Sequence, residues 1–207
     1  RPFKKDYQNI KHHLYGFQSA RKNFSTGDWL KLANQKILQC KKKKQIPILV
    51  GGTGLYFKAL TNGLVNIPNI PLSFRNRVRN LHKKLGQKKF FSELLILDPL
   101  IKDQINNKDA QRSIRAYEIK SYTKKSIKRW FKNTKSDYDH NDFFKICIDF
   151  PRKDLIERIN QRSKEMIESG AILEVKKFIK LRVPKDKSLS KAIGINEIKE
   201  YLQKKIQ

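Results

Sequence analysis

The sequence predicts an α/β fold in which an all-helical subdomain interrupts a parallel-sheet core. Two apolar runs, at 46–50 and 143–150, have the length and composition of buried parallel strands. Between about residue 66 and residue 142 no such run occurs, and helical patterns follow one another. We therefore expect a partial α/β core at 1–65, a helical insertion at 66–142, and a return to the core with C-terminal helices at 143–207.

The first part of the chain alternates in the order helix, strand, glycine turn, helix. Ser25 and its neighbours offer N-caps for a helix that ends in the lysine run 41–44. The strand at 46–50 follows, and the glycine turn at 51–54 breaks it before a helix that starts near Leu55. This order is typical of doubly wound sheets, which bind ligands at the turns after their strands.

Helical patterns fill the insertion and return after the second strand. Apolar side chains spaced at i, i+4, i+7 and i+11 from Phe74 predict a helix that Gly86 stops. Another helix is predicted to begin near Asp109, with its apolar set on one side and its polar residues elsewhere. The boundaries of the remaining helices are predicted at Pro151, Gly170, Pro184 and Gly194.

The charge of the chain favours a polyanionic partner. Forty-seven Lys and Arg against nineteen Asp and Glu give a formal net charge of +28. Such a charge attracts nucleic acid strongly and in a salt-dependent way. The alternative interpretation is a compositional bias towards Lys, Ile and Asn, which leaves part of the charge on a solvated surface.

Several classes of protein are disfavoured by the sequence. No apolar run approaches the roughly 18 residues of a membrane span, and no signal-peptide pattern opens the chain, so we expect a soluble, cytoplasmic protein without membrane contact. Cys40 and Cys147 lie far apart and have no Cys or His at metal-ligand spacing. This arrangement predicts neither a disulfide framework nor a zinc site.

Two motifs are candidates for chemistry. The turn Gly51-Gly52-Thr53-Gly54 at a helix start lets backbone N–H groups approach an anion or substrate, and it places the Thr53 hydroxyl at the mouth of the predicted sheet. Its alternative role is a tight connection only. Gln111, Arg112 and Arg115 combine an amide with two guanidiniums, which suits contacts to phosphates or base edges. A salt-bridged, exposed helix is the equally simple alternative.

Separated segments of the chain match one family in the right order. The most distinctive is IPILVGGTGLYFKAL at 46–60. The others are KHHL at 11–14, FSTGDW at 24–29, DP at 98–99, NKDAQRSIRAYE at 107–118, the block at 151–170, and KAIGINE at 191–197. Together they resemble the tRNA dimethylallyltransferase family nearly end to end.

The resemblance implies a fold, a reaction and partners. The fold is a P-loop NTPase-like parallel sheet with an inserted helical subdomain that binds the tRNA anticodon stem-loop. The reaction is transfer of a dimethylallyl group from dimethylallyl diphosphate to N6 of the adenosine beside the anticodon, position 37, in tRNAs that read codons starting with U. The resemblance also implies Mg²⁺ as cofactor, and we expect a monomer.

Roles of single residues follow from the same resemblance. Thr53 is expected to be catalytic, beside the attacking adenosine amine, with Gly51 and Gly52 binding substrate next to it. Arg75 is expected to contact the tRNA from the start of the insertion. The other expected substrate-binding residues are Gln111, Arg112, Ser113, Ile114, Arg115, Lys191, Ala192, Ile193, Gly194, Ile195 and Asn196.

The sequence also departs from the family pattern. The family's phosphate loop and general-base Asp are not found in the 207 residues. We therefore expect a fragment that lacks the N-terminal loop and the C-terminal end, and that binds RNA without competent chemistry. Lys191 stands in place of Arg and Ile195 in place of Tyr, which loses a forked donor and an aromatic stack. The alternatives are a tRNA-binding relative without catalysis and a fragment of a P-loop small-molecule kinase.

Overall fold

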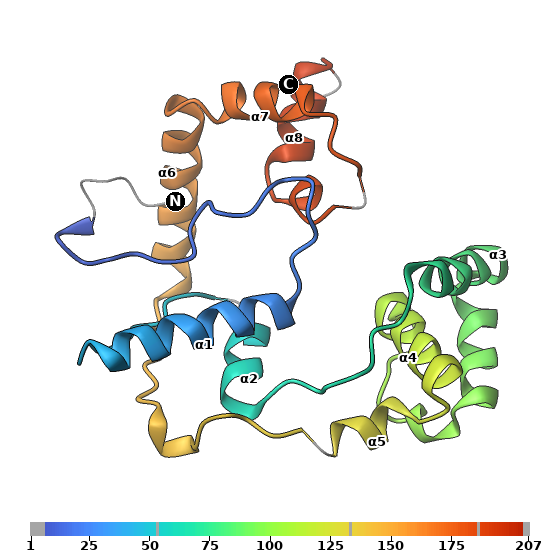
Figure 1. Cartoon of the computed structure of the whole chain (residues 1–207). Coiled ribbons are helices and arrows are strands. Elements are labelled where there is room, and N and C mark those ends of the chain that lie inside the picture. The colour runs from blue at the N-terminus through green and yellow to red at the C-terminus, as the bar shows by residue number, and fades with distance from the viewer. Residues whose placement is uncertain (1–6, 53, 133, 186, 205–207) are drawn as a thin grey trace. The chain divides into compact units, whose positions relative to one another are not determined.

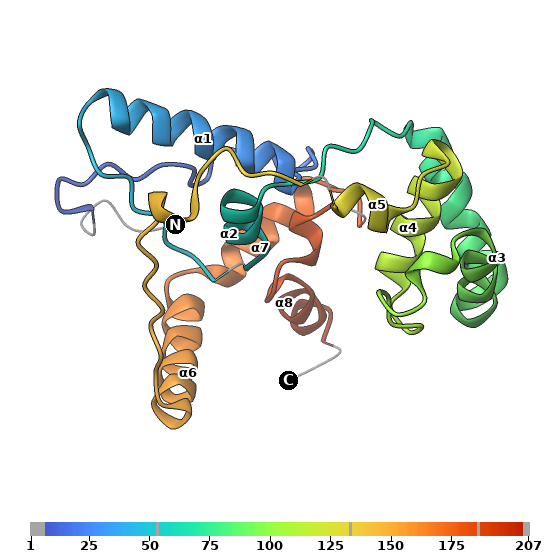
Figure 2. The same ribbon diagram turned by 90° about the horizontal axis from the view of Figure 1, so that it is seen from below.

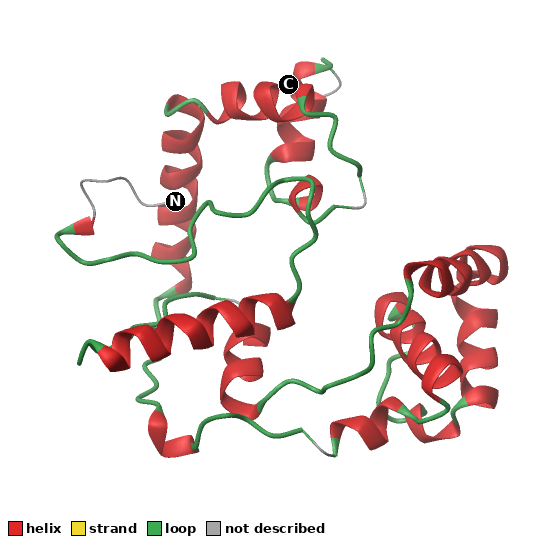
Figure 3. Ribbon diagram, viewed as in Figure 1, coloured by secondary structure: helices red, strands yellow, loops and turns green. Residues whose placement is uncertain are grey.

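The computed structural model describes residues 7–52, 54–132, 134–185 and 187–204. Within these ranges the regular structure is helical, as the ribbon coloured by secondary structure makes plain (Figure 3). The α-helices are α1 (Thr26–Lys42), α2 (Gly54–Asn62), α3 (Leu72–Leu97), α4 (Ala110–Thr123), α5 (Ile127–Phe131), α6 (Arg152–Glu168), α7 (Ala171–Lys180) and α8 (Ile195–Leu202) (Figure 1). Short 3-10 turns lie at η2 (Pro99–Ile101), η3 (His140–Asp142) and η4 (Leu189–Lys191).

The predicted α/β fold with a P-loop NTPase-like parallel sheet is wrong for this structure, because none of the described residues forms a strand. Residues 46–50 and 143–150 leave most of their apolar side chains exposed instead of burying them: Ile46 is 88% exposed and Phe144 93%. A strand is completed by hydrogen bonds to a neighbouring strand, and no such ladder reaches either segment within the described ranges. Apolar composition alone therefore did not produce strands here.

Most helix boundaries follow local signals in the sequence. The boundaries predicted at Pro151, Gly170 and Gly194 are confirmed, whereas α7 ends at Lys180, before the predicted boundary at Pro184. Ser25 is the N-cap of α1: its hydroxyl accepts a hydrogen bond from the Asp28 N–H (3.1 Å), while the Asp28 carboxylate accepts one from the Ser25 N–H (2.9 Å). This reciprocal pair satisfies two of the donors that a helix start leaves free. Lys41 and Lys42 lie in the last turn, where they interact favourably with the helix dipole.

The chain divides into two compact units. One contains the described residues up to Gly52 together with those from Phe144 onward, and the other lies between them and ends at Phe143. In the first unit, Ala33, Ile37 and Val175 are buried. The Arg21 guanidinium donates to the Leu181 carbonyl (3.0 Å) and so ties the loop before α1 to the end of α7. The predicted residues 191–196 belong to this unit.

The second unit is organised by the packing of α3 against α4, which lie side by side in both views (Figures 1 and 2). Leu94, Ile101, Ile105 and Ala116 form its buried apolar cluster. Tyr117 of α4 packs against this cluster, and the centroid of its ring lies 5.0 Å from that of the fully buried Phe90. This core fixes the two helices that carry the predicted RNA-contacting residues 75 and 111–115.

Gly86 interrupts α3. Its backbone angles, φ 72° and ψ 165°, are non-helical, whereas the residues on both sides continue as helix to Leu97. The combination is open to glycine and closed in practice to other residues. The prediction that the helix breaks at Gly86 is confirmed, but the chain resumes a helix in a new direction directly after it.

Candidate nucleic-acid interface

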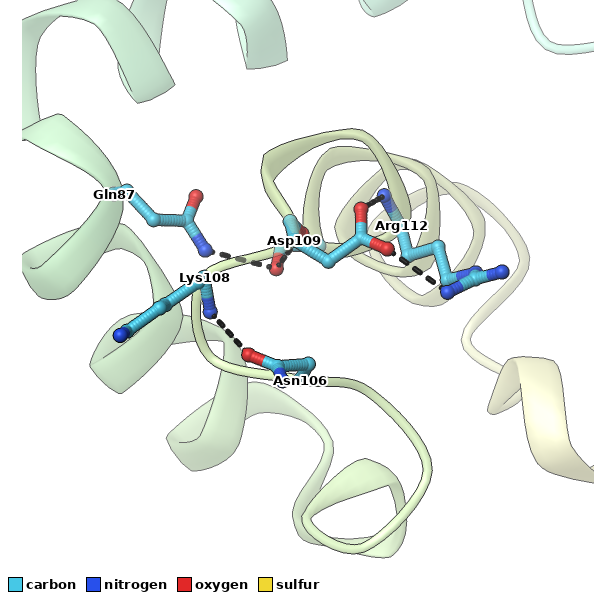
Figure 4. A network of polar contacts seen from close by, with 6 residues as sticks. Gln87, Asn106, Lys108, Asp109 and Arg112 are labelled. Carbon is cyan, nitrogen blue, oxygen red and sulfur yellow. Dashed lines mark hydrogen bonds and ion pairs between the residues drawn. The ribbon is translucent and has the colours of Figure 1, made fainter. Parts of the chain in front are cut away.

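The N-terminus of α4 is built around Asp109 (Figure 4). One carboxylate oxygen of Asp109 accepts the Arg112 backbone N–H (2.9 Å), and the other accepts its guanidinium (3.0 Å). The Arg112 side chain remains 75% exposed. Asp109 therefore caps the helix and holds one end of the Arg112 fork, while the rest of that guanidinium faces solvent.

Gln87 ties this helix start to α3 (Figure 4). Its amide nitrogen donates to the Asn107 carbonyl and to the Ser113 hydroxyl (3.2 Å), and its amide oxygen lies 2.9 Å from Nε2 of His82. Ser113 donates in turn to the Asp109 carbonyl (2.7 Å). Because Gln87 follows the break at Gly86 directly, the new direction of α3 is what brings its amide to the start of α4.

Five of the predicted RNA-contacting residues lie on α4, and the structure separates them by exposure. Gln111 and Arg112 are exposed, whereas Ile114 and Arg115 are partly buried. Ser113 is fully buried, and its hydroxyl is used inside the unit. The side chain of Ser113 is therefore placed to support the helix, and those of Gln111 and Arg112 are placed to meet a ligand.

Glu118 joins Arg115 to Arg75 across the two helices. The carboxylate of Glu118 is 2% exposed, and its Oε2 lies 3.1 Å from the Arg115 guanidinium and 3.5 Å from Nε of Arg75. The two arginine side chains are 41% and 39% exposed. Arg75 and Arg115, both predicted from the sequence, thus meet on one buried carboxylate that the sequence analysis did not single out. Its spacing of three residues from Arg115 on a helix was the available signal.

Positive charge covers much of α3 around this pair. The helix carries seven Lys and Arg residues and a single acid, Glu93. Arg77 lies over the Phe74 ring at 5.3 Å, and that ring packs edge-on against Tyr122 of α4 (5.4 Å). A basic helix with partly exposed aromatic rings is suited to a nucleic-acid backbone and to unstacked bases.

The other predicted residues that the structure describes lie before α2, in η4 and around the start of α8. Gly51 and Gly52 are exposed and have no regular structure, and Thr53 lies outside the described residues. Lys191 ends η4, and Ile193 is 100% exposed. Gly194 (φ 92°) is the N-cap of α8, and its N–H donates to the Glu197 carboxylate (2.9 Å). The remaining residues of this stretch are Ala192 and Ile195, partly buried, and Asn196, exposed.

Among the described residues, no three His, Cys, Asp or Glu side chains gather closely enough to hold a metal ion. None of the helices in the described part of the chain is long and apolar enough to cross a membrane.

Comparison with known families gives the assignment. The family described as IPP transferase matches residues 1–207. The chain belongs to the IPP transferase family. Among its relatives, the tRNA dimethylallyltransferase of Pelagibacter ubique is 57% identical over 206 residues, which cover 100% of this chain and 66% of that protein. The corresponding enzyme of Rickettsia massiliae is 43% identical over 195 residues, covering 93% and 53% respectively.

Solved structures of IPP transferases share the fold. The tRNA isopentenylpyrophosphate transferase of Bacillus halodurans matches with a TM-score of 0.61 and 28% identity, covering 100% of this chain and 64% of that one. The Staphylococcus epidermidis structure matches in fold with a TM-score of 0.59. The chain spans between about half and two thirds of the length of the curated relatives named above.

Proposed function

We propose that this chain forms part of a tRNA dimethylallyltransferase, which transfers a dimethylallyl group from dimethylallyl diphosphate to N6 of adenosine 37 in tRNAs that read codons starting with U. The observation that carries the proposal is the match to the IPP transferase family over residues 1–207. The relatives named above are tRNA dimethylallyltransferases. The arrangement of Arg75, Arg112 and Arg115 supports an RNA substrate on independent physical grounds.

The proposed role of the helical unit is to hold the anticodon stem-loop. The exposed guanidinium of Arg112 and the partly exposed ones of Arg75 and Arg115 keep unused N–H donors that suit phosphate oxygens. Gln111, exposed on the same helix, offers an amide that can accept from and donate to a base edge. Ser113 acts indirectly, because its buried hydroxyl fixes the helix start on which these side chains stand.

The proposed reaction is a nucleophilic substitution at carbon. The N6 nitrogen of adenosine attacks C1 of the dimethylallyl group, the bond from C1 to the diphosphate oxygen breaks, and diphosphate leaves with the bonding pair. N6 gives up one proton to a base. The Thr53 hydroxyl is proposed to orient the amine beside C1. Polar contacts of this kind hold an adenine that has left the base stack, while water is excluded.

The metal requirement stays a prediction of the family resemblance. Mg²⁺ prefers oxygen ligands, mostly carboxylates and phosphates. The described residues provide no cluster of three or more side chains that fits it.

The test is a chimaera in which this chain replaces the matching 206-residue region of the P. ubique enzyme. Radiolabelled dimethylallyl diphosphate is supplied with a synthetic anticodon stem-loop, and label in the RNA is measured. We expect the chimaera to transfer the group, and we expect Thr53→Ala in the chimaera to lower the rate about 100-fold with little change in RNA affinity. A chimaera that binds RNA but transfers nothing, beside an active P. ubique protein, would contradict the proposal and favour a tRNA-binding relative without catalysis.

A further inference from the structure

Glu118 is the most deeply buried charged group in contact with the predicted RNA-binding residues. Its carboxylate is 2% exposed, although it lies between two helices that carry mainly basic side chains on their outer surfaces. A carboxylate loses its hydration when it is buried at such a depth, and it is retained only where positive partners replace the water. Glu118 has two such partners, Arg75 from α3 and Arg115 from α4.

Both arginines contact the same oxygen atom. Oε2 of Glu118 lies 3.1 Å from Nη1 of Arg115, within hydrogen-bond distance, and 3.5 Å from Nε of Arg75. Two guanidiniums on one oxygen are held close together, where they would repel each other without the carboxylate between them. The shared carboxylate therefore fixes the spacing and direction of two cations that come from different helices.

The contact with Glu118 leaves N–H donors available on both guanidiniums. The Arg75 and Arg115 side chains are 39% and 41% exposed. Glu118 accepts a hydrogen bond from Arg115, whereas it is an ion-pair partner of Arg75, whose buried Nε makes no hydrogen bond among the described residues. Each guanidinium has five N–H donors in a rigid fork, and only one nitrogen of each faces Glu118. The remaining donors are free to meet an anion from solvent, and two adjacent forks match the spread oxygens of a phosphodiester backbone.

We propose that Glu118 is a positioning residue for RNA: its buried carboxylate holds Arg75 and Arg115 together as a paired phosphate-binding element. The inference rests on the proposed function, because it takes the tRNA anticodon stem-loop as the ligand. A negatively charged residue, which would repel RNA in direct contact, is thereby assigned a role in RNA binding. Glu118 acts through the arginines and does not touch the ligand itself.

The direction in which RNA affinity changes in a Glu118 variant distinguishes this positioning role from an effect of net charge alone. Glu118→Gln removes a negative charge from a chain of formal charge +28. If charge alone mattered, the variant would bind RNA as tightly as the unmodified chain or more tightly. If Glu118 positions the arginines, the variant binds less tightly, because the two guanidiniums separate and no longer meet neighbouring phosphates.

The experiment measures the affinity of the whole chain for a synthetic anticodon stem-loop at several salt concentrations. We expect Glu118→Gln to weaken binding about tenfold. The plot of log affinity against log salt, which falls with salt, should become less steep by about one to two. The matched control is Glu93→Gln, the same chemical change at the exposed acid of α3, which should leave affinity and slope unchanged or slightly strengthen binding.

A double-mutant cycle tests the positioning itself. Arg75→Gln should weaken RNA binding about tenfold in the unmodified chain and by less than about twofold in the Glu118→Gln background. A carboxylate that only joined the helices would leave the Arg75 effect the same in both. Far-UV circular dichroism checks that each variant keeps its helices. Should Glu118→Gln lose them, Glu118→Asp takes its place in the cycle, since it keeps the charge and withdraws the carboxylate by one methylene.

The possible outcomes are distinct. Equal or tighter binding by the folded Glu118 variant, or an Arg75 effect that persists in full, would overturn the inference and leave the proposed function intact. An unmodified chain that does not bind the stem-loop at all would overturn the RNA-binding part of the proposed function, and this inference with it.

Discussion

Replacing Gly86 by alanine should lower the stability of the second unit without any steric clash. A Cβ added at Gly86 would meet no atom within 4 Å. The cost comes from the backbone, because φ 72° with ψ 165° is a conformation that side-chain-bearing residues rarely adopt. Gly86→Ala therefore tests whether the break in α3 is required by the fold, free of any packing effect.

The expected magnitude can be worked from two opposing effects. Placing a non-glycine residue in such a conformation costs about 1–3 kcal/mol. Alanine also restricts the unfolded chain, which returns about 0.5 kcal/mol. The net loss is therefore about 0.5–2.5 kcal/mol, which corresponds to a fall in Tm of about 2–12 °C for a unit of roughly a hundred residues.

Thermal unfolding followed by circular dichroism at 222 nm, a standard helix wavelength, measures this loss. The matched control is Gly54→Ala at the start of α2 in the same unit, where an added Cβ also meets nothing within 4 Å and φ is not positive. That change should leave stability unaltered or raise it by about 0.5 kcal/mol. Equal effects at both positions would refute the argument from backbone conformation.

Two further predictions concern individual carboxylates. Asp98 is 1% exposed and both of its carboxylate oxygens lack a hydrogen-bond partner among the described residues, so Asp98→Asn should stabilise the chain by about 1 kcal/mol or more in urea unfolding. A destabilised variant would show that the carboxylate has an essential partner. The Ser25 hydroxyl, which donates to Asp28, holds the pKa of that carboxyl below its ordinary value. The stability contributed by Asp28 is thus present above its unfolded pKa and is lost as pH falls through its folded pKa. Ser25→Ala should cost about 1 kcal/mol at neutral pH and less in acid, as measured by unfolding at a series of pH values; a cost that does not change with pH would contradict this account.

Local signals in the sequence predicted the helices well. Ser25 and Asp109 were recognisable as helix starts because an N-cap depends only on residues up to three positions away. Gly86 was recognisable as a break for the same reason. The contact of Gln87 with the start of α4 joins residues twenty or more positions apart, and no local pattern reveals it.

The prediction of strands from the sequence was wrong because strand formation depends on long-range pairing. The apolar runs at 46–50 and 143–150 had the length and composition of strands, yet a strand also needs a partner strand, and none pairs with them within the described ranges. In the candidate site, the sequence identified Arg75 and Arg115 but missed Glu118 between them. Arg75 lies 43 residues before Glu118, and only the packing of α3 on α4 brings the two together.

The burial of Ser113 means that neighbouring positions of one motif respond to substitution in different ways. Gln111, Arg112 and Ser113 are consecutive, yet the first two face solvent and the third is buried beneath the helix start. A change at 111 or 112 alters the surface that α4 offers to a ligand and leaves the interior of the unit in place. A change at 113 removes a hydroxyl that bonds to the Asp109 carbonyl and accepts from Gln87, so it alters the helix start on which both neighbours stand.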